Sequence, residues 1–578
     1  MREKVEIMKK AKAGLALTMV AALLLGMAGC GSPTDTSTDA GSGADSTAGS
    51  SAAASGASSG STSDLNVMLE TEVESLDPQI ATDGTSFEVI ADFTDGLMQM
   101  DASGKAVPAV AQTYDVSQDG KTYTFHLRKD VKWSNGDPVT AKDFVFGWQR
   151  AVDPANASED AYMLSDIGQV KNAQDIIDKK ADKSTLGVKA VDDYTLQVEL
   201  NVPVSFFPSL MYFPTYYPIN EKFFESCGGK YGTSPSTTLS NGAFVLDTYE
   251  PAATSFHLSK NDKYYDASKI KLPGLSYQVI KDSQQALMSY QAGTLDTTLL
   301  NGDQVDQVKD DPSYKSVGAG YLWYIAPNIS KIPALANQNL RLAMTFALNR
   351  ESITADVLKD GSTPTYTAVP PQFATGPDGT DFSADQKKFS AYCAYDTAKA
   401  QDYYAKAKKE LNASSFRFKM TVDADDAPQK VAQVVKEQVE KTLPGVTIDL
   451  VVEPKKQRVE DMQDGNFELG LTRWGPDYAD PMTYLGMWVT KNSNNYGSWS
   501  NADYDALIQK CTSGDFCTKP TERWNAMFDA EKIVLEQAVI FPLYTQCNAE
   551  MVNSGVTGIE YHPVALNRVY KNASKADS

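Results

Sequence analysis

The segment from residue 123 to residue 150 constrains the fold most strongly, because it encodes a strand, a turn and a helix in succession. Tyr123, Phe125 and Leu127 alternate with polar residues, the period of two that is typical of a strand with one buried face. The Ser-Asn-Gly-Asp-Pro run at 134–138 then predicts a turn, because Asn and Gly tolerate positive φ and Pro cannot continue the strand.

A helix is predicted directly after this turn. Phe144, Trp148 and Ala151 recur at the spacing of one helical face. Thr140, with Asp143 three residues later, has nearly the pattern of a capping box, which marks the first turn of a helix. The whole segment therefore predicts part of an α/β core.

The length and composition indicate a body with more than one lobe. A chain of 578 residues exceeds the size at which one hydrophobic core stops growing, and 42% hydrophobic residues allow a sizeable core. The formal net charge of -21 argues against nucleic acid and anionic lipid as partners, since both require clustered Lys and Arg.

The N-terminus predicts export. Lysines precede an apolar run at 14–28, which is shorter than the roughly 20 residues of a membrane-spanning helix and is typical of a signal peptide at 1–29. Met27-Ala28-Gly29-Cys30 resembles the bacterial lipobox, in which the Cys sulfur is acylated, although Met27 departs from the usual Leu. This resemblance implies lipidation of Cys30, and a secretory signal cut at a small residue is the alternative.

Residues 30–63 are predicted to form a flexible linker behind this anchor. From Gly31 to Ser63 the chain is almost entirely Ser, Thr, Ala, Gly and Asp, and such a coil has an end-to-end distance of about 30 Å. We therefore expect an extracytoplasmic protein that is attached to the cell membrane through its lipid anchor only. The long spacer favours a Gram-positive host.

The cysteines are sparse, as is usual for an exported protein. The six cysteines less Cys30 leave an odd number, so at least one thiol has no partner within the chain. Cys511 and Cys517 are too far apart for a disulfide on an unbroken helix, but Ser513-Gly514-Asp515 is expected to break the helix and bring them together. A disulfide between them is predicted, and two unpaired structural thiols are the alternative.

No catalytic residue, metal ligand or cofactor is predicted. The three histidines are far apart in sequence, and none lies within short ligand spacing of a cysteine. The chain also lacks the HExxH, GxSxG and GxxxxGK[ST] motifs. Paired carboxylates such as Asp425-Asp426 are interpreted as solvated surface, so we expect a protein that is not an enzyme.

The order of several segments resembles one family, the extracellular solute-binding proteins, family 5, which feed ABC importers. The similarity runs from about residue 64 to residue 570 and includes the strand, turn and helix of 123–150. It implies an α/β, two-lobed fold like that of periplasmic binding proteins, with an extra domain inserted in the first lobe. The other matching segments are Glu74–Pro78, Asp95–Leu97, Asn241–Phe244, Tyr290–Asp296, Leu340–Arg350 and Trp474–Pro481.

The same resemblance implies the domain boundaries. The inserted domain is expected at 97–236 and lobe II at 322–545, and the chain is expected to cross between the lobes twice. Lobe I is then expected to combine 64–96, 237–321 and 546–571.

The loop Trp474–Pro481 is the predicted centre of ligand binding. It lies between a predicted strand at 467–471 and a predicted helix at 482–489, since its prolines exclude most of it from a helix interior. The Asp480-Pro481 pair has the sequence of an N-cap and a first helical residue. Asp477 has no such role, and in peptide-binding relatives the Asp at this position takes the α-ammonium of the ligand. Capping of the loop is the alternative role for Asp477.

The resemblance implies further contacts around this loop. Trp474 and Tyr478 are expected in the wall of the site, and the backbone from Arg473 to Gly475 is expected to pair with an extended ligand as an added strand. Lys455 stands where some relatives have Trp, and it is expected to meet a ligand carboxylate.

Two other groups are expected near the ligand. The loop Thr82-Asp83-Gly84 matches a cleft-lining segment of the first lobe, and its Gly permits a close backbone approach. Three tyrosines fall near positions where relatives place aromatic cleft residues, although packing in the core is the alternative for each. They are Tyr162, Tyr324 and Tyr544.

The function that the resemblance implies is that of a substrate-binding lipoprotein of a peptide ABC transporter. Such a protein captures short peptides between its lobes and delivers them to the transmembrane permease subunits, and we expect it to be a monomer. The alternatives are a surface receptor for peptide pheromones, a binder of nickel, haem or a sugar, and a hydrolase with an unrecognised site.

Overall fold

The computed structural model describes residues 63–101, 105–384 and 386–576. The predicted signal peptide, Cys30 and nearly all of the predicted linker lie outside the described residues. Within these three ranges, no helix is both long and apolar enough to cross a membrane.

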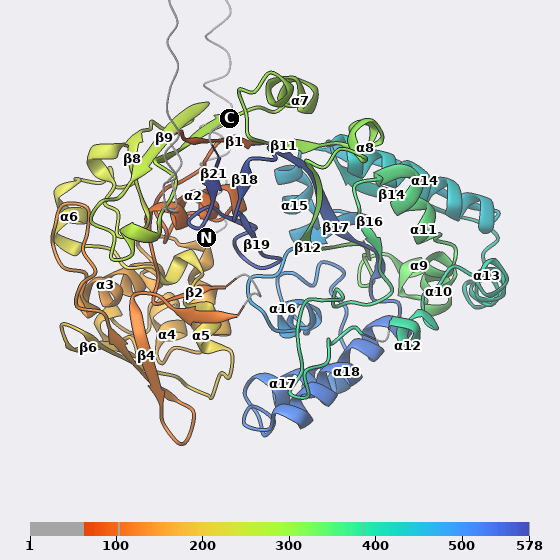
Figure 1. Cartoon of the computed structure of the whole chain (residues 1–578). Coiled ribbons are helices and arrows are strands. Elements are labelled where there is room, and N and C mark those ends of the chain that lie inside the picture. The colour runs from red at the N-terminus through yellow and green to blue at the C-terminus, as the bar shows by residue number, and fades with distance from the viewer. Residues whose placement is uncertain (1–62, 102–104, 385, 577–578) are drawn as a thin grey trace, which may run out of the picture. The chain divides into compact units, whose positions relative to one another are not determined.

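One large mixed sheet of eleven strands runs through the described chain (Figure 1). Its strands are β1 (Leu65–Leu69), β8 (Phe244–Thr248), β9 (Ser255–Lys260), β10 (Gly274–Val279), β11 (Thr297–Leu300), β12 (Tyr314–Pro327), β13 (Thr363–Pro364), β14 (Phe416–Asp423), β15 (Val446–Glu453), β16 (Leu469–Trp474) and β17 (Phe541–Val552). Their order is β15-β14-β16-β12-β17-β11-β1-β10-β9-β8, with β13 paired to β17. The pairs β1–β10, β1–β11, β14–β15 and β14–β16 are parallel, and the others are antiparallel.

The strand β12 contributes to two hydrophobic cores at once. Leu322, Tyr324 and Ala326 belong to one core, whereas Trp323 and Ile325 belong to the other. The cause is the strand geometry, in which successive side chains point to opposite faces. Both predicted crossings between lobes fall within β12 and its partner β17, although the lobe boundaries themselves stay a prediction.

The predicted strand, turn and helix of residues 123–150 are confirmed. The strand is β5 (Thr122–Leu127), with its three apolar side chains buried. The helix is α3 (Ala141–Val152), and the carboxylate of Asp143 accepts the backbone N–H of Thr140 at 2.7 Å. This hydrogen bond gives a partner to one of the backbone N–H groups that a helix N-terminus leaves free.

A second, antiparallel sheet contains β5 and lies within the predicted inserted domain. Its order is β4-β5-β7-β6, so every neighbouring pair except β5–β7 is also consecutive in sequence. Its other strands are β4 (Ala111–Val116), β6 (Val188–Asp192) and β7 (Thr195–Glu199).

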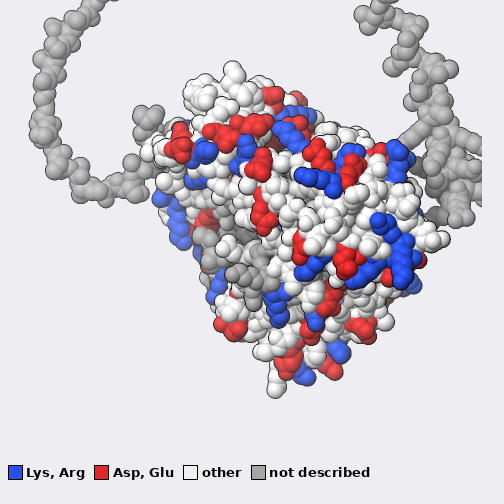
Figure 2. All heavy atoms as spheres, turned by 90° about the vertical axis from the view of Figure 1, so that its right-hand side faces the viewer, with Lys and Arg blue, Asp and Glu red and all other residues white. Residues whose placement is uncertain are grey.

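Helices surround these sheets. The longer ones are α2 (Gly84–Phe93), α3, α7 (Ser283–Gln291), α10 (Gln338–Phe346), α13 (Thr397–Leu411), α14 (Asp426–Thr442), α15 (Lys455–Gln463), α17 (Ala502–Thr512) and α18 (Pro520–Glu536). Figure 2 shows the face on which α13 and α14 lie, and Lys, Arg, Asp and Glu side chains are interspersed over it.

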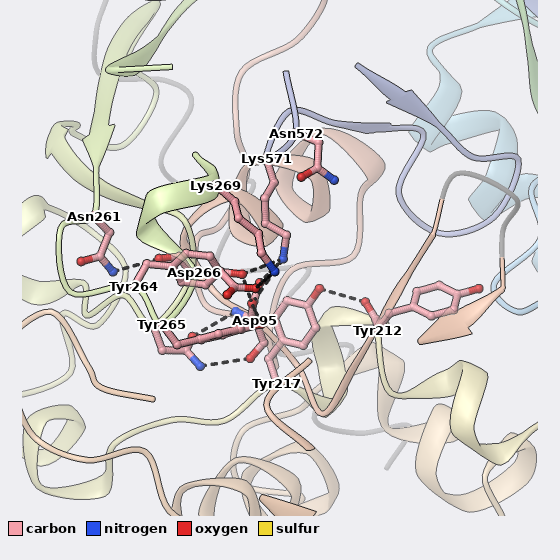
Figure 3. Close-up of polar contacts among 12 residues, drawn as sticks. Asp95, Tyr212, Tyr217, Asn261, Tyr264, Tyr265, Asp266, Lys269, Lys571 and Asn572 are labelled. Carbon is pink, nitrogen blue, oxygen red and sulfur yellow. Dashed lines mark hydrogen bonds and ion pairs between the residues drawn. The ribbon is translucent and has the colours of Figure 1, made fainter. Parts of the chain in front are cut away.

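The buried carboxylate of Asp95 ties the C-terminal segment to the first part of the chain (Figure 3). Its Oδ2 accepts hydrogen bonds from the hydroxyls of Tyr264 and Tyr265, each at 2.8 Å. Lys571 Nζ lies 3.0 Å from its Oδ1. A buried carboxylate is stable only when it is paired and hydrogen-bonded, and these three groups meet that condition.

Candidate functional site

The loop at 475–481 leaves the large sheet at the end of β16 and leads into α16 (Met482–Leu485). The predicted strand is present but begins two residues later than expected. The predicted helix is a single turn that continues as a 3-10 helix, Gly486–Trp488. Asp480 Oδ1 accepts the first N–H of α16 at 3.0 Å, although the N-cap residue is Pro481, one residue later than predicted.

A cavity of about 740 Å³ lies beside this loop, a volume within the range of ligand sites in proteins. One part of its wall comes from the predicted inserted domain, at 159–169 and 203–206. Another part comes from the loop itself, α16 and α17. Of the predicted ligand-binding residues, those in the wall are Thr82, Tyr162, Trp474, Asp477 and Tyr478.

Asp477 presents a carboxylate to this cavity without a cationic partner. The hydroxyl of Tyr162 donates to its Oδ2 at 3.0 Å, and its backbone N–H donates to Thr483 Oγ1 at 3.2 Å. No Lys or Arg of the described residues forms an ion pair with it. Burial raises the pKa of Asp477 to about 6, and the hydrogen bond from Tyr162 opposes that rise. The carboxylate is therefore desolvated and suited to a cationic ligand.

Asp480, three residues along, has the opposite environment. Its two oxygens accept from Arg523 Nη1 and Nη2 at 2.7 and 2.8 Å, a bidentate pair in which both side chains are buried. Arg523 Nε also donates to the carbonyl of Cys511 at 3.0 Å. Asp480 thus has a structural role and fixes α18 against the loop.

An aromatic stack closes part of the wall. Phe206, from the predicted inserted domain, lies parallel to Tyr478 of the loop, with 4.9 Å between ring centroids and 11° between ring planes. The Arg523 guanidinium lies 5.6 Å from the centroid of Phe206. The sequence analysis did not identify Phe206, because nothing in the local pattern separates it from its neighbour Phe207, which is fully buried.

The strand that leads into the loop has an unpaired edge. On one side, β16 pairs with β12 from Leu469 to Trp474. On the other side, β14 pairs only with Leu469 and Gly470. Between Leu471 and Trp474 this second edge has no strand partner in the described part of the chain. Leu471 and Thr472 of this stretch are buried and Trp474 lines the cavity, so an extended ligand can reach the edge at its Trp474 end as an added strand.

Several acidic residues of the wall were not identified from sequence either. They are Glu159, Asp160 and Asp166, from one segment of the predicted inserted domain, and Asp505, from α17. No motif connects the 159–166 segment with Asp505, so only the folded chain brings these two regions together. The wall is therefore more acidic than the loop sequence alone indicates.

Two predicted tyrosines do not line the cavity. Tyr324 and Tyr544 are buried in hydrophobic cores. Tyr324 packs edge-on against Trp488 at 5.4 Å, and Tyr544 stacks on Trp323 at 5.7 Å between ring centroids. The alternative, packing in the core, describes both residues in this structure: Tyr324 shares its core with Tyr478 and Met482 of the cavity wall but is itself fully buried behind that wall.

Three predicted residues near the loop also lie outside this wall. Arg473 lies over the rings of Tyr321 and Trp323, at 4.8 and 5.3 Å from their centroids. A Cβ on Gly475 would lie 2.4 Å from the Tyr321 ring, so only Gly fits beneath that ring. Lys455 is exposed at the start of α15 and is not in the cavity wall.

Asp83 and Gly84 have local structural roles at the start of α2. Asp83 Oδ1 accepts the backbone N–H of Ser86 at 2.9 Å and so caps the helix. Gly84 is exposed and has open space around the position of a Cβ. Neither residue is in the cavity wall, unlike the adjacent Thr82.

The predicted disulfide is absent from the structure. α17 ends at Thr512, so the predicted helix break is confirmed, but Cys511 and Cys517 are free thiols. Cys511 Sγ donates to the carbonyl of Arg523 at 3.6 Å, and Cys517 Sγ donates to the carbonyl of Cys511 at 3.7 Å. Each sulfur thus has a carbonyl partner. The structure therefore agrees with the alternative expectation, two unpaired structural thiols.

Comparisons with known proteins give one consistent result. Residues 105–496 match the family described as bacterial extracellular solute-binding proteins, family 5 Middle. A dipeptide-binding protein of Lactococcus lactis is 35% identical, over 87% of this chain and 93% of the relative. The oligopeptide-binding protein OppA of Bacillus subtilis is 33% identical, over 86% and 90%. 

The likeness extends to solved structures. The structure of Listeria monocytogenes OppA bound to peptide has a TM-score of 0.77 and 33% identity, and the match covers 90% of this chain and all of that one. A substrate-binding domain of an oligopeptide ABC transporter from Bacillus anthracis has the same TM-score at 35% identity, with 90% and 100% coverage. These matches confirm the predicted two-lobed α/β fold class.

Proposed function

Because this chain belongs to the bacterial extracellular solute-binding proteins, family 5, we propose that it captures short peptides in the cavity at the 474–481 loop and delivers them to an ABC permease. The observation that carries this proposal is the Asp477 carboxylate, which lines a ligand-sized cavity and has no Lys or Arg partner among the described residues. A desolvated anion of this kind favours a ligand that brings its own positive charge.

The α-ammonium of a peptide fits this requirement. It donates up to three hydrogen bonds, and one carboxylate with an adjacent tyrosine hydroxyl offers the acceptors. Asp477 and Tyr162 supply these groups, from the loop and from the predicted inserted domain respectively. The peptide amino terminus therefore bridges the loop and the predicted inserted domain.

We expect the rest of the peptide to be bound through its main chain and through apolar surfaces of the cavity that do not select particular side chains. The unpaired edge of β16 offers main-chain donors and acceptors to an extended chain, which binds peptides independently of their side chains. Trp474 and the stacked pair of Phe206 and Tyr478 provide flat apolar surfaces for side chains. No bond in the ligand is broken in this scheme, and the family consists of solute-binding proteins.

The cellular setting completes the proposal. Cys30 carries the lipid anchor, and the linker up to residue 63 gives the binding unit room to reach the transmembrane permease subunits. The protein acts as an extracytoplasmic monomer on a Gram-positive cell membrane. A nickel, haem or sugar binder and a hydrolase are not favoured, since the relatives above are described as peptide-binding. A pheromone receptor is not favoured, since one of the matching structures above is described as part of an oligopeptide ABC transporter.

Native mass spectrometry of freshly purified protein tests this function. We expect a mass excess that corresponds to short peptides, because a ligand that is shielded from solvent dissociates slowly. After unfolding and refolding to remove endogenous ligand, added Ala-Ala-Ala is expected to restore a bound species. A refolded protein that retains its thermal transition but binds neither Ala-Ala-Ala nor a mixture of short peptides would contradict the proposal.

Peptide affinity is expected to depend on pH through Asp477. Its raised pKa means that the ligand-free folded protein holds a proton there more tightly than the unfolded chain, so its contribution to the free energy of unfolding falls as the pH rises from about 4 to about 6. An ammonium needs the ionised carboxylate, so binding releases a proton near pH 6. Calorimetry with Ala-Ala-Ala should therefore show about tenfold weaker binding at pH 5 than at pH 7.

The control for this measurement is the Asp477→Asn variant. It cannot titrate at this position, so its affinity for Ala-Ala-Ala is expected to vary much less over the same range. Equal affinities of the natural protein at pH 5 and pH 7 would show that Asp477 does not take the amino terminus.

A further inference from the structure

The ligand cavity extends beyond the loop to a second region, between the segment 482–489 and α17. Both elements contribute to the cavity wall. The hydroxyl of Tyr504 donates to the carbonyl of Leu485. Asp505 Oδ1 accepts the backbone N–H of Thr490 at 3.0 Å. Hydrogen bonds within the protein therefore fix the two sides of this region relative to each other.

This region of the wall is mainly apolar. On α17, Asp505, Ile508 and Thr512 line the cavity and recur at the spacing of one helical face. The opposite side is formed by α16 and the 3-10 helix that continues it. We call the region the apolar end of the cavity, after its buried wall residues Met482, Met487, Ile508, Cys511 and Cys517.

The charged side chains beside the apolar end already have partners in the protein. Asp505 binds the main chain of the facing segment, as described above. Both terminal nitrogens of Arg523 bind Asp480, and its Nε donates to the carbonyl of Cys511. A charged ligand group would therefore lose its hydration here without gaining a partner, so this end favours an apolar group.

Gly486 leaves space in the wall at the apolar end. The residue lines the cavity, and a Cβ on it would have Met482 Cγ, at 3.9 Å, as its one neighbour within 4 Å among the described residues. Its φ of -61° and ψ of -24° are right-handed helical values that any residue adopts. Gly475 differs, since its Cβ would overlap the Tyr321 ring. Packing thus requires Gly at 475, whereas at 486 the missing side chain leaves room for a ligand.

The apolar end lies a short distance from the predicted position of the peptide amino terminus. Thr483 Oγ1 accepts the backbone N–H of Asp477, and Thr483 also lines the cavity. Gly486 is three residues later in the same helical segment, so the two positions are roughly 5 to 6 Å apart. An extended peptide advances about 3.3 Å per residue. A side chain that reaches the apolar end therefore belongs to one of the first three residues of the peptide.

From this arrangement we infer that Gly486 is a specificity-determining residue, which opens a subsite at the apolar end for an apolar side chain from one of the first three peptide residues. The inference rests on the proposed function, because it assumes that Asp477 holds the peptide amino terminus. In the complex this side chain packs against Met482, Met487 and Ile508, and the removal of apolar surface from water strengthens binding.

Calorimetry at pH 7.5 with Ala-Ala-Ala and its three single Leu derivatives tests the inference. The derivatives are Leu-Ala-Ala, Ala-Leu-Ala and Ala-Ala-Leu. The natural protein is expected to bind at least one of them about tenfold more tightly than Ala-Ala-Ala, as the burial of a Leu side chain predicts. The same peptide with Asn in place of Leu has a side chain of similar size, and it should show no such gain.

The Gly486→Leu variant is expected to reduce the ratio of these two affinities to about one, because its own side chain fills the subsite. Gly486→Ala adds a single methyl group and should reduce the ratio to about threefold. Ala506→Leu is the matched control, since it adds bulk at an exposed position of α17 that is not in the cavity wall. It should retain the full preference. Thermal unfolding establishes that each variant is folded before its affinities are compared.

The outcomes distinguish this inference from the proposed function. If none of the peptides binds the natural protein, the proposed function fails. The function stands and the role of Gly486 is wrong if no Leu peptide binds more tightly than Ala-Ala-Ala, or if the Asn peptide gains as much as the Leu peptide. The role is also wrong if both Gly486 variants keep the full preference.

Discussion

Replacement of Asp477 by Asn is expected to weaken the binding of Ala-Ala-Ala by about 10- to 100-fold. The substitution keeps the shape of the side chain and its acceptor for the Tyr162 hydroxyl, but it removes the charge that faces the α-ammonium. A hydrogen bond between charged partners contributes about 1.5 to 3 kcal/mol, which corresponds to this loss of affinity. Isothermal titration calorimetry at pH 7 measures it.

N-acetylated Ala-Ala-Ala supplies the second arm of a double-mutant cycle. It lacks the ammonium, so it should bind the natural protein as weakly as the free peptide binds the Asn variant. The acetylated peptide should lose little further affinity on that variant, because the two changes remove the same interaction. Additive losses would show that Asp477 contacts another part of the ligand.

Replacement of Asp480 by Ala is expected to lower the free energy of unfolding by about 3 to 5 kcal/mol, because it leaves the Arg523 guanidinium buried without its counter-ion. The change also removes the acceptor for the first N–H of α16. Urea denaturation of the natural and variant proteins measures the difference.

The control is Asp402→Ala, which breaks the ion pair with Lys406 on α13. Both side chains of that pair are more than half exposed, so the loss should stay below about 1 kcal/mol. If Asp480→Ala costs no more than this control, the buried pair does not hold the loop against α18.

The sequence predicts secondary structure best where the pattern depends only on neighbouring residues. The alternation at Tyr123, Phe125 and Leu127 and the helical spacing that follows depend on near neighbours, and β5 and α3 agree with them. Asp477 and Trp474 were also expected in the wall of a ligand site, and they line the cavity. That expectation came from the family resemblance, which the order of the matching segments carries, and the periodicity of the local sequence does not predict it.

The residues that sequence did not identify depend on distant contacts. Phe206 and Asp160 become part of the site only because the predicted inserted domain approaches the loop after β16. Tyr324 packs in a core and is not in the wall of this cavity, which the sequence does not determine, because β12 lies between two cores and the face that each residue occupies depends on register. The sequence spacing of Cys511 and Cys517 likewise does not determine where each thiol points, and each one finds a carbonyl instead.

A crystal structure of the complex with Ala-Ala-Ala tests the central claim most directly, through the distance from the peptide amino nitrogen to the nearest Asp477 carboxylate oxygen. The account predicts about 2.7 to 2.9 Å, the length of a hydrogen bond between charged partners, with the peptide backbone along the unpaired edge of β16. A peptide bound outside this cavity, or one with its carboxylate end at Asp477, would contradict it.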